Sequence, residues 1–119
     1  KKRWFNYLVW IDPEGHTLLQ QRQGKDIWQG LYEFPLIETS EAVDATQLAS
    51  LLGEEGANLT MSLYNAEPIV HKLTHQHLYT FFWILLSPTP LEKSVLISHL
   101  PHYPVSALTA NFIDKFWQL

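Results

Sequence analysis

The most constraining feature of this sequence is its most apolar run, Leu78–Leu86. With the alternation of a β-strand, the run is apolar on both faces, because Phe81 and Trp83 point one way while Phe82 and Ile84 point the other. A strand of this kind belongs in the middle of a sheet that is covered on both sides. The run therefore predicts a domain in which helices pack against both faces of a central sheet.

A second strand is expected directly before this run, over Ala66–Leu73. Only a few polar residues, Thr74, His75 and Gln76, separate the two strands, and so short a connection predicts a hairpin. The tip of such a hairpin projects polar atoms from a rigid base, which suits a recognition site. A polar turn without any function remains the simpler interpretation of the tip alone.

The first half of the chain predicts several strands. Lys1–Arg3 is expected to end a linker, and Trp4–Asp12 to form a strand. Turn residues over Asp12–Gly15 then return the chain as Thr17–Arg22, the expected hairpin partner of the first strand. The aromatic-rich stretch Ile27–Pro35 is expected to be a packed loop that leads into a short edge strand over Phe34–Glu38, because Pro35 cannot donate to a ladder.

Two helices are expected, one in the middle of the chain and one at its end. The first covers Asp44–Leu52, with Thr39 or Ser40 as its cap, an apolar side of Leu48, Leu51 and Leu52, and Gly53 and Gly56 as its stop signals. The last helix begins at Pro104 or Val105, has Ser106 near its cap and runs to Leu119. Short strands are expected over Asn58–Tyr64 and Val95–Ile97. The whole chain, residues 1–119, is thus predicted to be one α/β (α+β) domain with a mixed sheet sandwiched by helices.

Composition excludes several classes of chemistry. The chain has no cysteine, which rules out disulfides, iron–sulfur ligation and a thiol nucleophile within it. Its formal net charge of -4 argues against tight, autonomous DNA binding. The cations that could share a face are Lys1, Lys2, Arg3, Arg22, Lys25 and Lys72. No apolar run approaches the length that spans a bilayer.

The motifs of several enzyme classes are also missing. No phosphate-binding Gly-rich loop and no nucleophilic Ser or Cys motif occurs. His71, His75 and His77 are close in sequence, but one hairpin places them on different faces, so no metal site is expected. His71 is expected to be tied into hydrogen bonds and His77 to be a half-buried aromatic.

The order of strands and helices resembles that of the Nudix hydrolases, whose signature helix supplies glutamates to a divalent metal ion. Glu54 and Glu55 match part of the end of that signature, but Leu36 stands where the first glutamate is required, counting from Gly30. The helix Asp44–Leu52 carries no glutamate. We therefore expect no catalytic residues in this chain.

Three segments resemble the C-terminal domain of the MutY-type adenine DNA glycosylases, which has a Nudix-like fold without the Nudix signature. These segments are Leu18–Arg22 followed by Ile27–Pro35 (IWQGLYEFP, similar to W-x-G-L-[WY]-x-F-P), His71–His75 (HKLTH, similar to H-x-F-[ST]-H), and Pro104–Ser106 at the start of the last helix. They span nearly the whole chain. Leu73 departs from the usual Phe of this family, whereas Thr74 keeps the hydroxyl.

The resemblance implies a lesion-recognition domain that reads 8-oxoguanine opposite adenine in double-stranded DNA, or guanine opposite adenine. It also implies a separate upstream catalytic domain, which carries a 4Fe–4S cluster and excises the adenine. The implied DNA- and lesion-binding residues are Leu73, Thr74, His75, Gln76, Lys72 and Arg22. Trp28 and Phe34 are expected to be core aromatics, and Arg22 either meets a phosphate or pairs with Asp26 or Glu33. The expected location is cytoplasmic, at the nucleoid of a bacterial cell.

Two alternatives remain open at this point. The first is a Nudix-fold hydrolase of nucleoside diphosphate derivatives whose carboxylates are placed unusually. The second is a protein-interaction module that uses the acidic segment Glu38–Glu55, which contains no Lys or Arg.

Overall fold

The long apolar strand lies at the centre of a five-stranded mixed sheet in a computed structural model, which describes residues 1–57 and 59–119. This strand, β8 (His77–Leu86), pairs in parallel with β1 (Lys2–Ile11) along its whole length, from Lys2 opposite His77 to Ile11 opposite Leu86. The edge strand β5 (Leu36–Thr39) lies antiparallel on the other side of β1. The predicted edge strand therefore forms, shifted toward the helix that follows it.

Two short strands share the remaining edge of β8. β6 (Thr60–Leu63) pairs with the end of β8, and β7 (Ile69–Lys72) pairs with its beginning. Asn65 fills the gap between them: its Nδ2 donates to the carbonyl of Thr80 and its Oδ1 accepts from the N–H of Phe82, both at 2.9 Å. The predicted β7–β8 hairpin and the short strand after the first helix are confirmed, although Asn58 lies outside the described residues.

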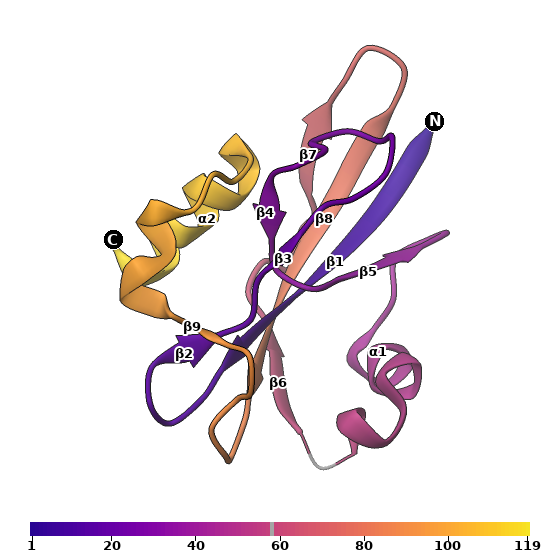
Figure 1. Cartoon of the computed structure of the whole chain (residues 1–119). Helices are drawn as coiled ribbons and strands as arrows, with labels where there is room; N and C mark the ends of the chain where they lie inside the picture. The colour runs from indigo at the N-terminus through magenta and orange to yellow at the C-terminus, as the bar shows by residue number, and fades with distance from the viewer. Residues whose placement is uncertain (58) are drawn as a thin grey trace.

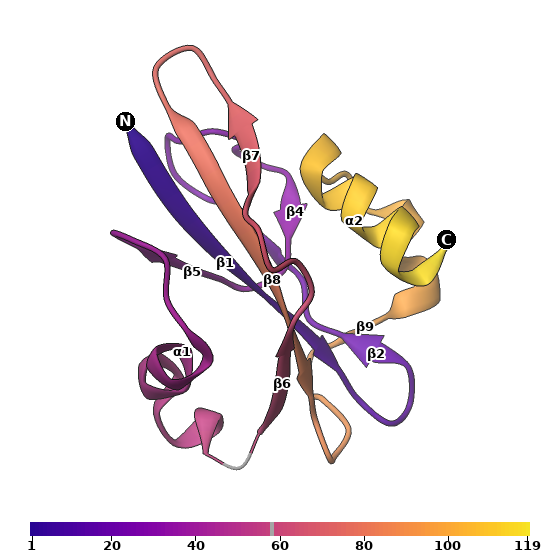
Figure 2. The same ribbon diagram turned by 180° about the vertical axis from the view of Figure 1, so that it is seen from behind.

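Each face of β8 is buried by a different helix, as the sequence predicts. The larger hydrophobic cluster contains Leu78, Phe82 and Ile84 and is covered by α2 (Ala107–Trp117) through Phe112 and Ile113. The smaller cluster contains Phe81, Trp83 and Leu85 and is covered by α1 (Ala45–Leu52) through Leu48. Figures 1 and 2 show the two helices on opposite sides of the long strands. Phe34 is fully buried in the α2-side cluster and Trp28 packs against it, so both are core aromatics as expected.

The expected hairpin between Trp4–Asp12 and Thr17–Arg22 is wrong. β8 and β5 occupy both edges of β1, and the returning chain divides into β2 (His16–Thr17) and β3 (Gln20–Gln21). These form two small ribbons, β2 with β9 (Val95–Leu96) and β3 with β4 (Tyr32–Glu33). Lys1–Arg3 is not a linker either, because Lys2 and Arg3 begin β1 and the carbonyl of Lys1 accepts from the N–H of His77 (2.7 Å).

The first helix is capped by Asp44 and not by Thr39 or Ser40. The Asp44 carboxylate accepts from the N–H of Gln47, and the Gln47 side chain accepts from the N–H of Asp44, both at 2.8 Å, which completes a capping box. Gly53 ends the helix with a positive φ of 65°, and a 3₁₀ turn, η1 (Gly53–Gly56), follows. Leu48 is buried, but Leu51 is 55% exposed, so the apolar side of α1 is narrower than predicted.

We expect Asp44→Ala to lower the free energy of unfolding by about 1 kcal/mol, because the first turn of α1 loses an acceptor for an otherwise unpaired N–H. Urea unfolding followed by circular dichroism measures the loss. Ser40→Ala is the matched control and should leave the midpoint unchanged. Equal losses in the two variants would contradict the assignment of the cap to Asp44.

Ser106 caps α2 as predicted, and its hydroxyl accepts from the N–H of Thr109 (3.2 Å). A 3₁₀ segment, η2 (Ile97–His102), leads from β9 toward this helix. None of the helices in the described part of the chain has the length and apolar character needed to cross a bilayer.

Candidate nucleic-acid interface

The tip of the β7–β8 hairpin is an ordered turn at one end of the sheet, beside the start of β1 (Figure 1). The last pair of the ladder is Lys72 with His77, and the N–H of Leu73 donates to the carbonyl of Gln76 at 2.8 Å. Leu73 and Gln76 are half-buried, whereas Thr74 and His75 are exposed. The turn therefore presents the Thr74 hydroxyl and the His75 imidazole to solvent from a backbone that is closed by a hydrogen bond.

Arg3 holds this turn from the α2 side of the sheet. Its Nη1 donates to Oε1 of Gln76 at 3.0 Å and to Oδ1 of Asp26 at 2.8 Å. The remaining donors engage both carboxylate oxygens of Glu38 at 2.8 Å and Oδ2 of Asp26 at 2.9 Å. A single, nearly buried guanidinium thus ties together β1, the β3–β4 loop, the edge strand β5 and the hairpin turn.

A second guanidinium extends this ion-pair network beneath the loop. Arg22 donates from Nη2 to Oδ2 of Asp26 at 2.8 Å and from Nη1 to both oxygens of Glu33 at 3.1 and 3.2 Å. Glu33 in turn accepts from the hydroxyl of Tyr7 at 2.9 Å. The sequence left open whether Arg22 meets a phosphate or pairs with Asp26 or Glu33. In the structure its side chain is only 9% exposed and forms ion pairs with both carboxylates.

The network shifts the pKa values of its members in the directions that these contacts require. Hydrogen bonds from Arg3 hold the pKa of Asp26 well below its usual range, and they also lower the pKa of Glu38. Burial acts in the opposite direction on both carboxyl groups, but its effect is smaller. The same contacts raise the pKa of Arg3. Burial, reinforced by the negative charge of Glu33, raises the pKa of Tyr7. The carboxylates of Asp26 and Glu38 are therefore ionised at neutral pH and neutralise Arg3.

The Trp28 loop supports the hairpin from the same side. Trp28 has a positive φ of 57°, unusual for a residue with a side chain, and its carbonyl accepts from the N–H of Leu31 at 3.0 Å. Its ring meets the ring of His71 in β7 edge-on, with centroids 5.7 Å apart, and that of Phe5 at 6.5 Å. Two segments singled out by sequence, Ile27–Pro35 and His71–His75, are thereby brought into contact.

The structure brings most of the predicted site residues to one end of the molecule, in different environments. Thr74, His75 and Lys72 are exposed, Leu73 packs against the α2-side cluster, Gln76 is tied to Arg3, and Arg22 lies in the ion-pair network. Sequence reasoning missed Arg3, Asp26 and Glu38 as supports of the turn. The available signal was alternation, because Arg3 lies on the same face of β1 as Phe5 and Tyr7.

The histidines near the tip do not converge. His77 is exposed, which corrects the expectation of a half-buried ring, and the His71 side chain packs on Trp28 without a hydrogen bond to any described residue. No group of three or more metal-ligating side chains occurs among residues 1–57 and 59–119.

The helix that would supply metal ligands in a Nudix hydrolase does not have the required donors. An open hollow beside α1 is lined by Gln47, Ser50 and Leu51 from the helix and by Thr39, Ser40, Glu41 and Val43 before it. Glu41 contributes the one carboxylate of this lining. Divalent cations such as Mg²⁺ are held through carboxylate oxygens, so these residues do not fit the metal site of a diphosphate hydrolase.

Comparison with known proteins agrees with the mixed α/β architecture. A family model described as the NUDIX domain matches residues 6–115. The C-terminal domain of mouse MUTYH, solved in complex with human PCNA, is 18% identical, with a TM-score of 0.72 over 99% of this chain and 88% of that chain. The MutT protein of Methanosarcina mazei Go1 is 14% identical, with a TM-score of 0.67 over 98% and 94% of the two chains.

A Nudix hydrolase from M. smegmatis, RenU, is also 14% identical and has a TM-score of 0.57 over 98% of this chain and 83% of its own. No curated protein matches the sequence closely enough to count as a relative. At these identities, the likeness to solved structures establishes the fold.

Proposed function

This chain belongs to the NUDIX domain family, and from that premise we propose that it is the lesion-recognition domain of a MutY-type adenine DNA glycosylase. In this proposal, the domain reads 8-oxoguanine opposite adenine during base excision repair and has no catalysis of its own. The observation that carries the proposal is the supported hairpin turn, which presents Thr74 and His75 at the end of the sheet. The likeness in fold to the C-terminal domain of mouse MUTYH supports it.

The chemistry of the turn suits the distinction between the two bases. Guanine offers N7 as an acceptor, whereas 8-oxoguanine carries a hydrogen on N7 and a carbonyl oxygen at C8. A hydroxyl can accept a hydrogen bond from the N7–H of 8-oxoguanine and can also donate to an oxygen. The single hydroxyl oxygen of Thr74 therefore suffices to distinguish 8-oxoguanine from guanine. His75 lies next to it, and Lys72 pairs with His77 at the base of the turn. In this proposal Lys72 binds a phosphate of the duplex.

The supports behind the turn make such a reading precise. A recognition group must be held close to its productive geometry by side chains that are themselves fixed. Gln76 is hydrogen-bonded to Arg3, and His71 packs against Trp28. Leu73, which replaces the usual Phe of the family, is half-buried against the core, and we assign it to anchoring the turn.

The proposal also places the chemical step elsewhere. Adenine excision and the 4Fe–4S cluster belong to a separate catalytic domain, because this chain has no cysteine to hold a cluster. The net charge of -4 fits a module that binds DNA weakly alone and adds selectivity when it is tethered, since tethering raises its effective concentration at the DNA.

We expect Thr74→Ala to reduce the preference for 8-oxoguanine:adenine over guanine:adenine. Loss of the hydroxyl leaves a polar group of the lesion unpaired, which costs about 1–3 kcal/mol, or roughly a 5- to 150-fold loss of discrimination. The measurement is single-turnover adenine excision on both duplexes, by this chain joined to the catalytic domain of an adenine glycosylase. Thr74→Ser is the matched control and should retain most of the preference. An unchanged ratio for a folded Thr74→Ala variant would mean that another residue reads the lesion.

A nucleoside diphosphate hydrolase is the second candidate, favoured by the family and by the likeness in fold to the MutT protein. The missing carboxylates of α1 count against it. The two candidates are separated by incubating the chain with nucleoside di- and triphosphates plus Mg²⁺ or Mn²⁺ and measuring release of phosphate and diphosphate. Enzyme-like turnover would favour the hydrolase.

A further inference from the structure

The α1-side face of the sheet is uncovered near the hairpin tip. Helix α1 packs lower on this face, where Leu48 meets the cluster of Phe81, Trp83 and Leu85, and Figure 1 shows α1 well away from the tip. Between the cluster and the tip, the strand pairings align two rows of side chains across β1, β8 and β7. The first row is Trp4, Tyr79 and Val70, and the second row, at the tip itself, is Lys2, His77 and Lys72.

All three members of the second row, which we call the basic row, are exposed. Neighbouring strands are about 4.8 Å apart, so Lys2 and Lys72 flank His77 across a strip about 10 Å wide. The ammonium group of Lys2 lies 5.3 Å from the centroid of the Tyr79 ring. Neither lysine forms an ion pair with a carboxylate of residues 1–57 or 59–119.

The first row forms a packed, largely aromatic surface next to the basic row. The rings of Trp4 and Tyr79 are stacked with centroids 4.6 Å apart, and Trp4 stacks in turn on the buried Phe81 at 6.3 Å. Val70 is 43% exposed beside them. The Lys2 side chain therefore lies over an aromatic surface that continues into the core.

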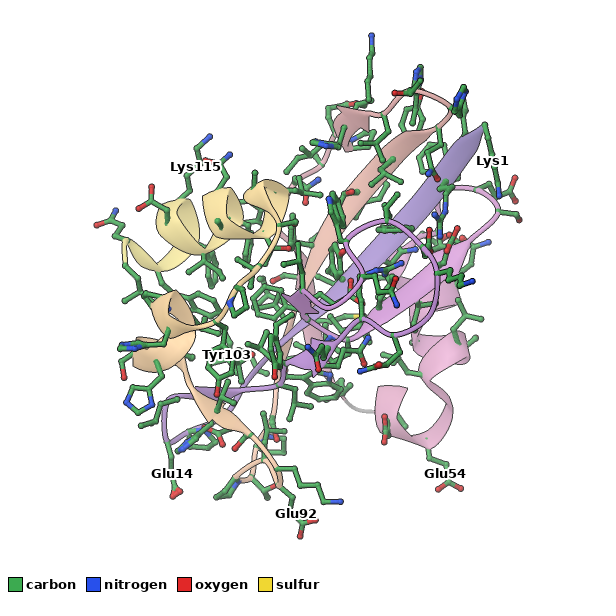
Figure 3. All side chains as sticks on the ribbon, turned by 45° about the horizontal axis from the view of Figure 1, so that its top comes forward. Lys1, Glu14, Glu54, Glu92, Tyr103 and Lys115 are labelled. Atoms are coloured by element: carbon green, nitrogen blue, oxygen red, sulfur yellow. The ribbon has the colours of Figure 1, made fainter. Side chains whose placement is uncertain are left out.

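The charges on the opposite face favour the basic row as the surface on which a polyanion binds at this end. On the opposite face, Arg3 and Arg22 are matched by three carboxylates, Asp26, Glu33 and Glu38. Figure 3 shows Lys1 at the hairpin end of the molecule, while Glu14, Glu54 and Glu92 lie at the far end. Basic residues are thus concentrated at the hairpin end and acidic residues at the far end, although the net charge of the chain is negative.

We propose that the basic row binds the sugar–phosphate backbone of duplex DNA, so that the duplex lies on the α1 side of the hairpin. Duplex DNA carries one negative charge per about 1.7 Å of its axis, so several phosphates face a strip of this width. Lys2 and Lys72 neutralise phosphates and His77 donates from its ring N–H. The identity of the base at the turn rests on the proposed function above, whereas the backbone contact does not depend on a lesion.

The test uses a short duplex without a lesion and the chain itself. Fluorescence anisotropy gives the dissociation constant between about 50 mM and 200 mM salt, over which phosphate contacts are strongly screened. Lys2→Ala and Lys72→Ala should each weaken binding and lower the slope of log affinity against log salt by about one, and the double variant by about two. Lys115→Ala, an exposed lysine of α2, is the matched control and should match the wild type. Thermal unfolding confirms that each variant is folded.

Several results would overturn the proposal: a slope that Lys2→Ala and Lys72→Ala leave unchanged, tighter binding of a single strand than of the duplex, or no binding at the lowest salt. Amide shifts that cluster on the α2 side in a titration with the duplex would do so as well. The lesion reader and the basic row can therefore fail independently, because loss of lesion preference and loss of salt dependence are measured on different substrates.

Discussion

Phe82→Ala should lower the free energy of unfolding by about 3–5 kcal/mol, the largest effect that we expect from a single substitution. Phe82 is fully buried, and its ring stacks on Phe112 with centroids 4.1 Å apart and planes only 6° from parallel. Tyr7 stacks on it at 5.4 Å, and Phe34 meets it edge-on at 6.5 Å. Removing the ring leaves a cavity where β1, β8 and α2 meet. Urea unfolding at neutral pH, followed by circular dichroism, measures the loss.

The same strand provides a control for this prediction. Leu86 lies at the end of β8 and is 46% exposed, so Leu86→Ala removes far less buried surface and should cost less than about 1 kcal/mol. Domains of this size are stable by only about 5–15 kcal/mol, so Phe82→Ala should leave a small margin. Similar losses for the two variants would contradict the central place that we give to the β8–α2 contact.

Arg3→Met should have the next largest effect, a loss of about 2–4 kcal/mol at neutral pH. The Arg3 side chain is 10% exposed and makes five hydrogen bonds to Asp26, Glu38 and Gln76. The substitution leaves two carboxylates unmatched, but they are 34% and 40% exposed, so water recovers part of the loss. Methionine keeps the apolar stem, which isolates the effect of the charge. Urea unfolding provides the measurement, with Lys115→Ala as the control.

The difference between wild type and Arg3→Met should narrow as the pH falls. Hydrogen bonds from Arg3 lower the folded-state pKa values of Asp26 and Glu38 below their unfolded values of about 3.9 and 4.3. A lowered carboxylate pKa contributes stability that is present above the unfolded pKa and is lost as the pH falls through the folded value. Arg3→Met lacks this contribution, so its deficit should be largest near neutrality and shrink below about pH 4. A deficit that stays constant from neutral to acidic pH would show that packing, and not charge, accounts for the role of Arg3.

The sequence by itself determined the features that depend on local alternation and local capping. The two apolar faces of β8 required cover on both sides, and α1 and α2 supply it. The polar interruption at Thr74–Gln76 produced the β7–β8 hairpin, because neighbouring strands with so short a connection pair with each other. Ser106 and Gly53 marked the ends of helices, since their signals act within one turn. The exposure of Thr74 and His75 follows from the position of the turn.

Other features were decided only by the tertiary structure, because they join segments that are distant in sequence. The short turn after the first strand predicted that Thr17–Arg22 would pair with it. Instead, β8 and β5 pair with the two edges of β1, and no local signal in the sequence encodes these pairings. Nothing in the sequence distinguishes Arg3 from the other basic residues. It supports the turn only because the fold brings Asp26, Glu38 and Gln76, from three other segments, within hydrogen-bonding distance of it. The basic row likewise exists only because three strands place Lys2, His77 and Lys72 side by side.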